Sequence, residues 1–133
     1  MIFIDTGAWV ARFSKRDQYH QTSLELWMKL RVSGGRVVTS DSVMVETIAL
    51  LGRRIGPHAA VEAGRFMQGW KALHILRATK QEEMTALNLL EKFADKEMGF
   101  VDCLSFALMR HERIQTAFTF DRHFEKAGFR VFG

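Results

Sequence analysis

MIFIDTG, the stretch from Met1 to Gly7, places the strongest constraint on the fold. Its short apolar run predicts a buried β-strand, and the polar residues Asp5 and Thr6 are both suited to cap a helix that follows. The same pattern returns in AFTFD, an apolar run that ends on Asp121. Aspartate is rarely buried unless it is paired or bound to a cation. Two acids at the ends of two expected strands therefore indicate a site.

Two further acids interrupt apolar runs elsewhere in the chain. Glu46 lies within SVMVETIALL and Asp102 within GFVDCLSFALM, and both runs are expected to be helical. Burying an unpaired charge costs several kcal/mol or changes its protonation state. Four acids placed in this way predict one shared acidic pocket, and hard divalent cations such as Mg²⁺ or Mn²⁺ bind at all-oxygen sites of this kind.

Each acid alone also has a simpler structural explanation. Asp5 is placed to cap a helix, and Asp121 is placed to form a turn before a short helix. Glu46 would be ordinary on the solvated face of its helix, and the dipole at a helix N-terminus favours Asp102. Most of these explanations would have to hold together to remove the site.

Short apolar strands alternate with helices along the whole chain. The expected strands are 1–5, 36–39, 73–76, 115–120 and 129–132, and the expected helices include 23–32, 43–55, 59–70, 80–94, 100–110 and 122–127. This alternation predicts an α/β fold with three layers, α/β/α, and a mostly parallel central sheet of four to five strands. Ligands of such sheets bind beyond the carboxyl ends of the strands, where Asp5 and Asp121 are expected.

Length and charge limit the possible classes of protein. The 133 residues fit one domain spanning 1–133, because no linker, repeat or low-complexity tract divides them. Nineteen Lys and Arg against fifteen Asp and Glu give a net charge of +4. If a cation neutralised the four acids, the remaining positive charge would attract nucleic acid. A solubilising excess of basic residues explains the same charge.

The remaining composition points to the cytoplasm. Cys103 is the single cysteine, so no internal disulfide is possible, and buried packing is its expected role. No apolar run approaches the roughly 20 residues that a membrane span requires. The N-terminal residues carry neither a positive segment nor a cleavage site, so a signal peptide is not expected. We therefore expect a cytoplasmic protein without a membrane contact.

The four motifs together resemble a known family. MIFIDTGAWVA, TSDSVMVETIALL, GFVDCLSFALMR and AFTFDRHFEKAGF occur in the order expected of a PIN domain, over nearly the full length. The resemblance is strongest to the single-domain VapC-type toxins of toxin–antitoxin pairs. It implies a Mg²⁺- or Mn²⁺-dependent endoribonuclease on a parallel sheet, with the acidic quartet Asp5, Glu46, Asp102 and Asp121.

The resemblance also implies roles for individual residues. Asp5, Asp102 and Asp121 are expected to ligate metal directly, while Glu46 acts through bound water, and one or two metals are both compatible with the quartet. Thr119, two positions before Asp121, and Thr6, directly after Asp5, are expected to hold carboxylates or waters by hydrogen bonds.

Basic side chains near the pocket are candidates for contacts with substrate phosphates. Arg122 and His123 adjoin Asp121 and are the first candidates. Weaker candidates elsewhere in the chain are Lys15, Arg16, Arg53 and Arg54. Asp95 belongs to a stretch expected to be solvated, although its proximity to Asp102 leaves open whether it joins the site.

As a member of this family, the chain would cleave RNA, dimerise and bind a cognate antitoxin near the acidic pocket. The large apolar residues available for such contacts, which are equally suited to internal packing, are Trp9, Phe13, Trp27, Phe66, Met67 and Trp70. The alternative function is a catalytically weak PIN-like module that binds RNA or protein. A receiver-like phosphoacceptor domain is a third hypothesis, but the adjacent acidic pair that it requires near the N-terminus is absent.

Overall fold

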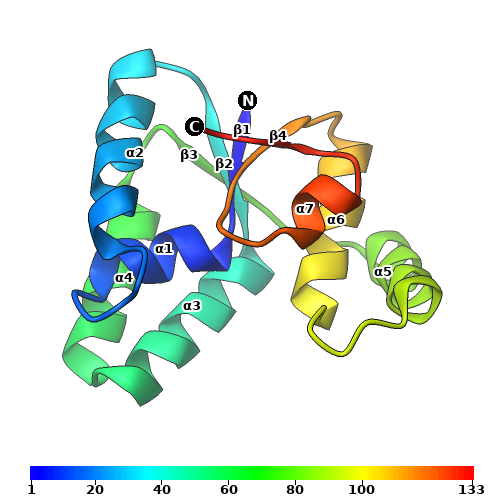
Figure 1. Ribbon diagram of the computed structural model, residues 1–133, viewed down its shortest axis with the longest axis horizontal. Coiled ribbons are helices and arrows are strands. Elements are labelled where there is room, and N and C mark those ends of the chain that lie inside the picture. The colour runs from blue at the N-terminus through cyan, green and yellow to red at the C-terminus, as the bar shows by residue number, and fades with distance from the viewer.

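The computed structural model describes residues 1–133 and contains one five-stranded sheet in which every neighbouring pair of strands is parallel (Figure 1). The strand order is β3-β2-β1-β4-β5. The strands are β1 (Ile2–Ile4), β2 (Val37–Ser40), β3 (Leu73–Leu76), β4 (Thr116–Phe118) and β5 (Arg130–Val131). The chain first moves outward from β1 to β3 and then returns to β4 on the other side of β1. The order of the strands therefore reverses between β1 and β4, which is where open α/β sheets bind ligands.

Seven helices cover both faces of this sheet. They are α1 (Thr6–Phe13), α2 (His20–Ser33), α3 (Asp41–Arg54), α4 (Pro57–Gly69), α5 (Lys80–Phe93), α6 (Phe100–His111) and α7 (His123–Lys126). Figure 1 shows α1 to α4 on one side of the sheet and α5 to α7 on the other. The three-layer α/β/α prediction is thereby confirmed.

Local sequence signals account for most element boundaries. The Ser40 hydroxyl accepts a hydrogen bond from the Val43 N–H at 3.1 Å and so caps α3, and serine is among the residues preferred at this position. Gly34 ends α2 in the left-handed conformation, with φ of 66°. Asp5 occupies the N-cap position of α1 but makes no capping hydrogen bond, so the capping role is wrong for its side chain.

The fourth strand is shorter than the sequence pattern predicts. It ends at Phe118 instead of Phe120. The Thr119 hydroxyl accepts the Asp121 N–H at 3.0 Å and donates to Asp5, so this segment bonds to the site and not to a neighbouring strand. The hydrogen bonds of Thr119 thus end the strand two residues earlier than the apolar pattern predicts.

Aromatic side chains fill the core on both faces of the sheet. On one face, the Trp9 and Trp27 rings lie 4.9 Å apart, and on the other, Phe106 and Phe124 are also separated by 4.9 Å. The candidate contact residues Trp9, Trp27 and Met67 are fully buried, and Phe13, Phe66 and Trp70 pack against the same core. Internal packing therefore accounts for Trp9, Trp27 and Met67, whereas Phe13, Phe66 and Trp70 pack against the core and remain half-exposed. None of the helices is long and apolar enough to cross a membrane.

Candidate active site

An acidic cavity of about 460 Å³ lies beyond the carboxyl ends of β1 and β4. All four predicted acids line it, and they come from the end of β1, from α3, from α6 and from the loop after β4. The complete lining is Asp5, Thr6, Gly7, Val10, Asp17, Gln18, Tyr19, Glu46, Leu50, Arg54, Glu97, Asp102, Phe120 and Asp121. These residues form the acidic cavity. The convergence expected from the sequence is present.

Asp5 is the buried centre of the acidic cavity. Its side chain is 4% exposed, and one carboxylate oxygen accepts a hydrogen bond from the Thr119 hydroxyl at 2.9 Å. Burial, with a smaller contribution from the negative charge of Asp102, raises the pKa of Asp5 from 3.8 to about 7. The hydrogen bond from Thr119 opposes this shift. Asp5 therefore lacks a positive partner that would compensate its buried charge.

Asp121 is held by one hydrogen bond through its backbone and one through its side chain. Its N–H donates to the Thr119 hydroxyl at 3.0 Å, and its carboxylate accepts the N–H of His123 at 2.9 Å. Thr119 thus connects the two strand-end acids, since the same hydroxyl donates to Asp5. This placement agrees with the expected supporting role of Thr119. Thr6 is different, because its hydroxyl is buried beside the cavity without any hydrogen-bond partner.

His123 lies between two carboxylates. Its Nε2 is 3.0 Å from Asp95, and its Nδ1 is 2.7 Å from Asp121, although the second contact lacks hydrogen-bond geometry. Burial lowers the pKa of His123, but the two carboxylates outweigh burial and the net shift is upward. Asp95 does not line the acidic cavity and reaches Asp121 only through His123.

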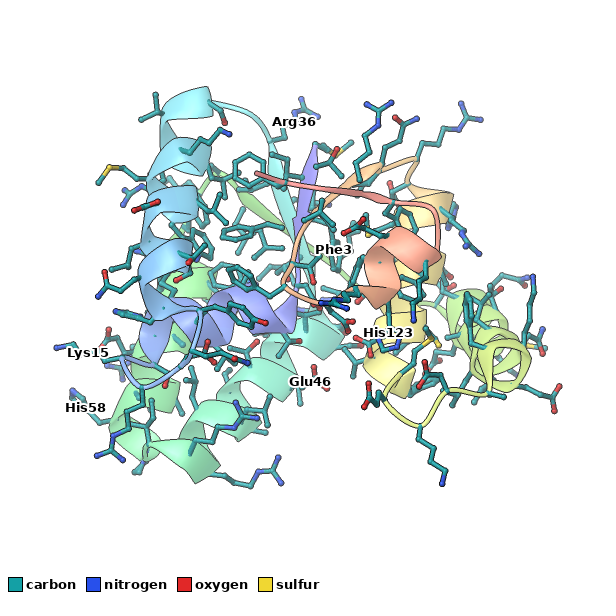
Figure 2. All side chains as sticks on the ribbon, in the orientation of Figure 1. Phe3, Lys15, Arg36, Glu46, His58 and His123 are labelled. Atoms are coloured by element: carbon teal, nitrogen blue, oxygen red, sulfur yellow. The ribbon has the colours of Figure 1, made fainter.

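Asp102 and Glu46 complete the quartet from two helices. Asp102 lies in the first turn of α6, where its carboxylate accepts the Gly99 N–H at 2.9 Å. Burial raises the pKa of Asp102 to about 6, and the charges of Asp121 and Glu46 add to this increase. No hydrogen bond or ion pair restrains the Glu46 carboxylate, which Figure 2 shows near the carboxyl end of the sheet, as it does His123.

The burial of the quartet differs from the expectation. Only Asp5 is fully buried, whereas Glu46, Asp102 and Asp121 are half-buried. The apolar neighbours of Glu46 in the sequence, such as the exposed Val45, point elsewhere because a helix distributes consecutive residues around its axis. The acidic cavity therefore combines one desolvated carboxylate with three that water can reach.

The residues present fit a divalent metal in their chemistry. The donors are carboxylate oxygens with a threonine hydroxyl beside them, a set suited to Mg²⁺ or Mn²⁺. Mutual repulsion within the quartet is the electrostatic condition that a cation relieves. No three His, Cys, Asp or Glu side chains are close enough in this arrangement to ligate one ion together. Rotation of the half-buried carboxylates would be needed to enclose an ion.

The basic residues that lie nearest the acidic cavity are not the first candidates for phosphate contacts. Arg54 lines the acidic cavity, whereas Arg122 is exposed outside it. His123 is only 7% exposed and both ring nitrogens face carboxylates, so it offers no free donor to a phosphate in this arrangement. Lys15 and Arg16 line a neighbouring hollow that shares Arg54 with the acidic cavity, while Arg53 is exposed without lining either. A basic surface formed by Lys15, Arg16 and Arg54 thus adjoins the cavity.

Sequence reasoning missed several residues of the cavity. Glu97, two positions after Asp95 in the stretch expected to be solvated, lines the acidic cavity together with Asp17. Tyr19 and Phe120 form an aromatic wall of the same cavity. Phe120 read as the last residue of a strand, and Tyr19 is the only tyrosine of the chain, which was the one signal available. Their proximity depends on the fold, since 101 positions separate them in the sequence.

Comparisons with known proteins agree with this geometry. The model of the PIN domain family matches residues 2–130. The chain is 38% identical over 129 residues to the 23S rRNA-specific endonuclease VapC20 of Mycobacterium tuberculosis, which covers 97% of this chain and 95% of that protein. The crystal structure of that protein, described as a Sarcin-Ricin loop cleaving toxin, superposes with a TM-score of 0.87 at 37% identity, covering 97% of this chain and 96% of the other.

More distant solved structures share the fold. FitAcB from Neisseria gonorrhoeae has a TM-score of 0.70 at 13% identity, covering 100% of this chain and 97% of the other. VapBC2 from Rickettsia felis, bound to a DNA fragment from their promoter, has a TM-score of 0.66 at 17% identity, covering 98% and 97%. The family model and the 38% identity each extend over almost the whole chain. The chain therefore belongs to the PIN domain family, among the toxins of the VapC type.

Proposed function

We propose that this protein is a Mg²⁺- or Mn²⁺-dependent endoribonuclease and the toxin of a VapBC-type toxin–antitoxin pair. The observation that carries the proposal is the convergence of Asp5, Glu46, Asp102 and Asp121 on one cavity, at the point where the strand order reverses. The similarity to a 23S rRNA-specific endonuclease over 97% of the chain supports the same activity. The catalytically weak binding module has no comparable support.

Asp5, Asp102 and Asp121 would hold the metal, and Glu46 would orient the attacking water. When bound, such a cation polarises the phosphoryl group and makes water a better nucleophile at neutral pH. The Thr119 hydroxyl keeps Asp5 and Asp121 in a fixed relation, because it donates to one residue and accepts from the other. Glu46 lines the acidic cavity without a hydrogen bond or ion pair to its carboxylate, which would leave it able to rotate toward a water molecule.

Arg54, Lys15 and Arg16 would bind the RNA backbone beside the acidic cavity. Their side chains line two adjoining hollows that meet at Arg54. Basic side chains at this position compensate the repulsion between the acidic quartet and phosphate groups. The relative at 38% identity suggests the sarcin–ricin loop of 23S rRNA as the first substrate to test.

The same proposal includes two protein contacts. An antitoxin would cover the acidic cavity and present a basic side chain to the carboxylates, which would neutralise them in the absence of RNA. A homodimer would bury exposed apolar residues on the outer helices, such as Val45 on α3 and Met84 and Leu87 on α5. Analytical ultracentrifugation of the purified protein, alone and with the cognate antitoxin, measures both contacts.

The decisive test is cleavage of RNA by the purified protein. The substrates are a synthetic hairpin that carries the sarcin–ricin loop and total tRNA, each incubated with Mg²⁺, with Mn²⁺ or with EDTA. Discrete cuts are expected only with metal, and Asp5→Asn and Asp102→Asn should each lower the rate more than about a hundredfold. Asp41→Asn, an acid on α3 outside the acidic cavity, is the matched control and should cut normally.

Cleavage that continues in EDTA would refute the metal dependence but leave the nuclease. Absence of cleavage by folded, metal-loaded protein on every RNA would refute the nuclease itself. Circular dichroism and a thermal melt of each variant exclude loss of folding as the cause.

A further inference from the structure

Two aromatic rings form one wall of the acidic cavity. Tyr19 and Phe120 stack with ring centroids 4.5 Å apart and an angle of 1° between their planes. Tyr19 is the outer ring, because it is 39% exposed while Phe120 also packs edge-on against Phe118 at 6.1 Å. A parallel aromatic pair is thus presented at a cavity whose other lining is mostly charged or polar.

Hydrogen bonds hold the segment that carries Tyr19 in place. The Asp17 carboxylate accepts the Tyr19 N–H at 2.9 Å, and the Asp17 N–H donates to the Ser14 carbonyl at 3.1 Å. The His20 N–H donates to the Asp17 carbonyl at 3.0 Å, and the His20 ring lies 2.6 Å from the Ala11 carbonyl. Tyr19 is therefore oriented before any ligand arrives, which reduces the entropy that binding would cost.

Phe120 is attached directly to the residues of the site. It lies between Thr119, which donates to Asp5, and Asp121, whose N–H donates to Thr119. Any ligand that rests on this aromatic pair is consequently held at a fixed position relative to two carboxylates of the quartet. Gln18, with an exposed side chain, lines the same cavity beside Tyr19.

We propose that Tyr19, stacked on Phe120, is a platform for an unpaired nucleobase of the RNA next to the cleavage position. This inference rests on the proposed nuclease function and adds a binding subsite to it. Unpaired bases of RNA loops are recognised chiefly by stacking on aromatic side chains. Arg54 lines the same cavity and supplies positive charge for the adjoining phosphate. An aromatic wall beside the acidic cavity thus holds the base, while Lys15, Arg16 and Arg54 receive the backbone.

The test combines variants of Tyr19 with changes in the RNA. The probe is the sarcin–ricin hairpin with 2-aminopurine placed at one unpaired position at a time, and Asp5→Asn keeps it intact in Mg²⁺. Stacking on Tyr19 should quench the fluorescence of one position, Tyr19→Phe should preserve the quenching, and Tyr19→Leu should remove it. Loss of the aromatic face should weaken binding roughly tenfold or more. Met28→Ala, an exposed apolar residue on α2, is the matched control.

A second measurement separates a base platform from a purely structural role. An abasic nucleotide at the quenched position should weaken binding to the protein with Tyr19 by about tenfold and leave binding to Tyr19→Leu unchanged. Equal effects of the abasic nucleotide on both proteins, or quenching that persists in Tyr19→Leu, would overturn the platform. A thermal melt of Tyr19→Leu checks that the stack is not required for folding.

The two proposals fail in different ways. If the active protein cuts the hairpin but no position depends on Tyr19, the platform is wrong and the nuclease stands. If the hairpin is neither cut nor bound, that substrate is wrong, and the quenching experiment is repeated with an unstructured oligoribonucleotide containing 2-aminopurine. Absence of quenching dependent on Tyr19 there also overturns the platform.

Discussion

The two ends of the sheet carry hollows of almost equal size and opposite character. The acidic cavity at the carboxyl end measures about 460 Å³, and a hollow at the amino end, lined by Met1, Gly34, Gly35, Arg36, Ala72 and His74, measures about 440 Å³. Figure 2 shows Glu46 and Arg36 at these opposite ends. The first contains six carboxylates and the second contains none. Size alone therefore does not distinguish a site.

Helix polarity explains part of this contrast. In a parallel α/β sheet, helices start near the carboxyl ends of the strands, and the positive ends of their dipoles favour carboxylates there. Asp102 in the first turn of α6 is the clearest case. At the other edge helices finish, and α2 carries Arg31 in its last turn before Gly34. Helix dipoles thus favour acidic residues at the carboxyl end of the sheet and basic residues at the amino end, even without a ligand.

The largest expected effect comes from neutralising the carboxyl end while leaving the amino end as a control. Glu46→Gln and Asp121→Asn should each lower RNA cleavage by about a hundredfold or more, because the proposed metal site would lose a ligand or an orienting group. His74→Ala in the hollow at the amino end should leave the rate within about twofold. Initial rates on the hairpin measure all three. A loss of activity in His74→Ala equal to that in Glu46→Gln would show that the contrast between the two ends has no functional meaning.

Stability against pH gives the next effect, because Asp5 has no counterion. Its folded pKa of about 7 lies above the unfolded value of 3.8, so the native state retains a proton that the unfolded state has lost. Without metal, burial of Asp5 therefore costs no stability below about pH 4, where both states are protonated. The free energy of unfolding then falls as the pH rises to about 7. The loss amounts to about 2–4 kcal/mol.

Urea unfolding of metal-free protein at pH 4 and pH 8 measures this loss. Asp5→Asn, which retains an acceptor for Thr119, should be more stable than the unmodified protein at pH 8 and similar at pH 4. Mg²⁺ should stabilise the unmodified protein at pH 8 more than it stabilises Asp5→Asn. His74→Ala should follow the unmodified protein at both pH values. If the stability of Asp5→Asn fell between pH 4 and pH 8 as much as that of the unmodified protein, the uncompensated charge would lie on a residue other than Asp5.

Local sequence patterns predicted the elements of this fold well but not the connections within the site. The resemblance to the PIN family implied that Thr119 supports the quartet, and its hydroxyl bonds to both Asp121 and Asp5. The placement of Arg54 in the cavity and of Arg122 outside it depends on how α3 and α7 are oriented. Proximity to an acid in the sequence therefore did not predict which basic side chain lines the acidic cavity.

The same limit explains why the aromatic pair was missed. Tyr19 belongs to a polar segment between two helices, and Phe120 belongs to an apolar run that reads as a strand. Neither pattern carries information about the other, since the segments that hold them are brought together by the parallel pairing of β1 and β4. Periodicity reports which face of an element is buried, and tertiary contacts between loops lie outside it.

A smaller effect is expected from the hydroxyl that joins the two strand-end acids. Thr119→Val keeps the shape of the side chain but removes both hydrogen bonds, so cleavage should fall about tenfold. Thr119→Ser should recover most of the rate because it restores the hydroxyl. Thr116→Val in β4, a half-buried threonine outside the cavity, is the matched control. Equal rates for Thr119→Val and Thr116→Val would show that the link between Asp5 and Asp121 is dispensable.

The smallest effect is expected from a residue outside the acidic cavity that contacts it through a neighbour. Asp95 contacts His123 at 3.0 Å, and His123 in turn approaches Asp121, so we expect Asp95 to be a positioning residue and not a ligand. Asp95→Ala should lower cleavage by about threefold to tenfold and weaken Mg²⁺ binding by a similar factor, as for residues that orient metal ligands. Lys96→Ala, its exposed neighbour, should change neither quantity. Isothermal titration with Mg²⁺ separates the two roles, because direct ligation by Asp95 would instead produce a loss as large as that of Asp121→Asn.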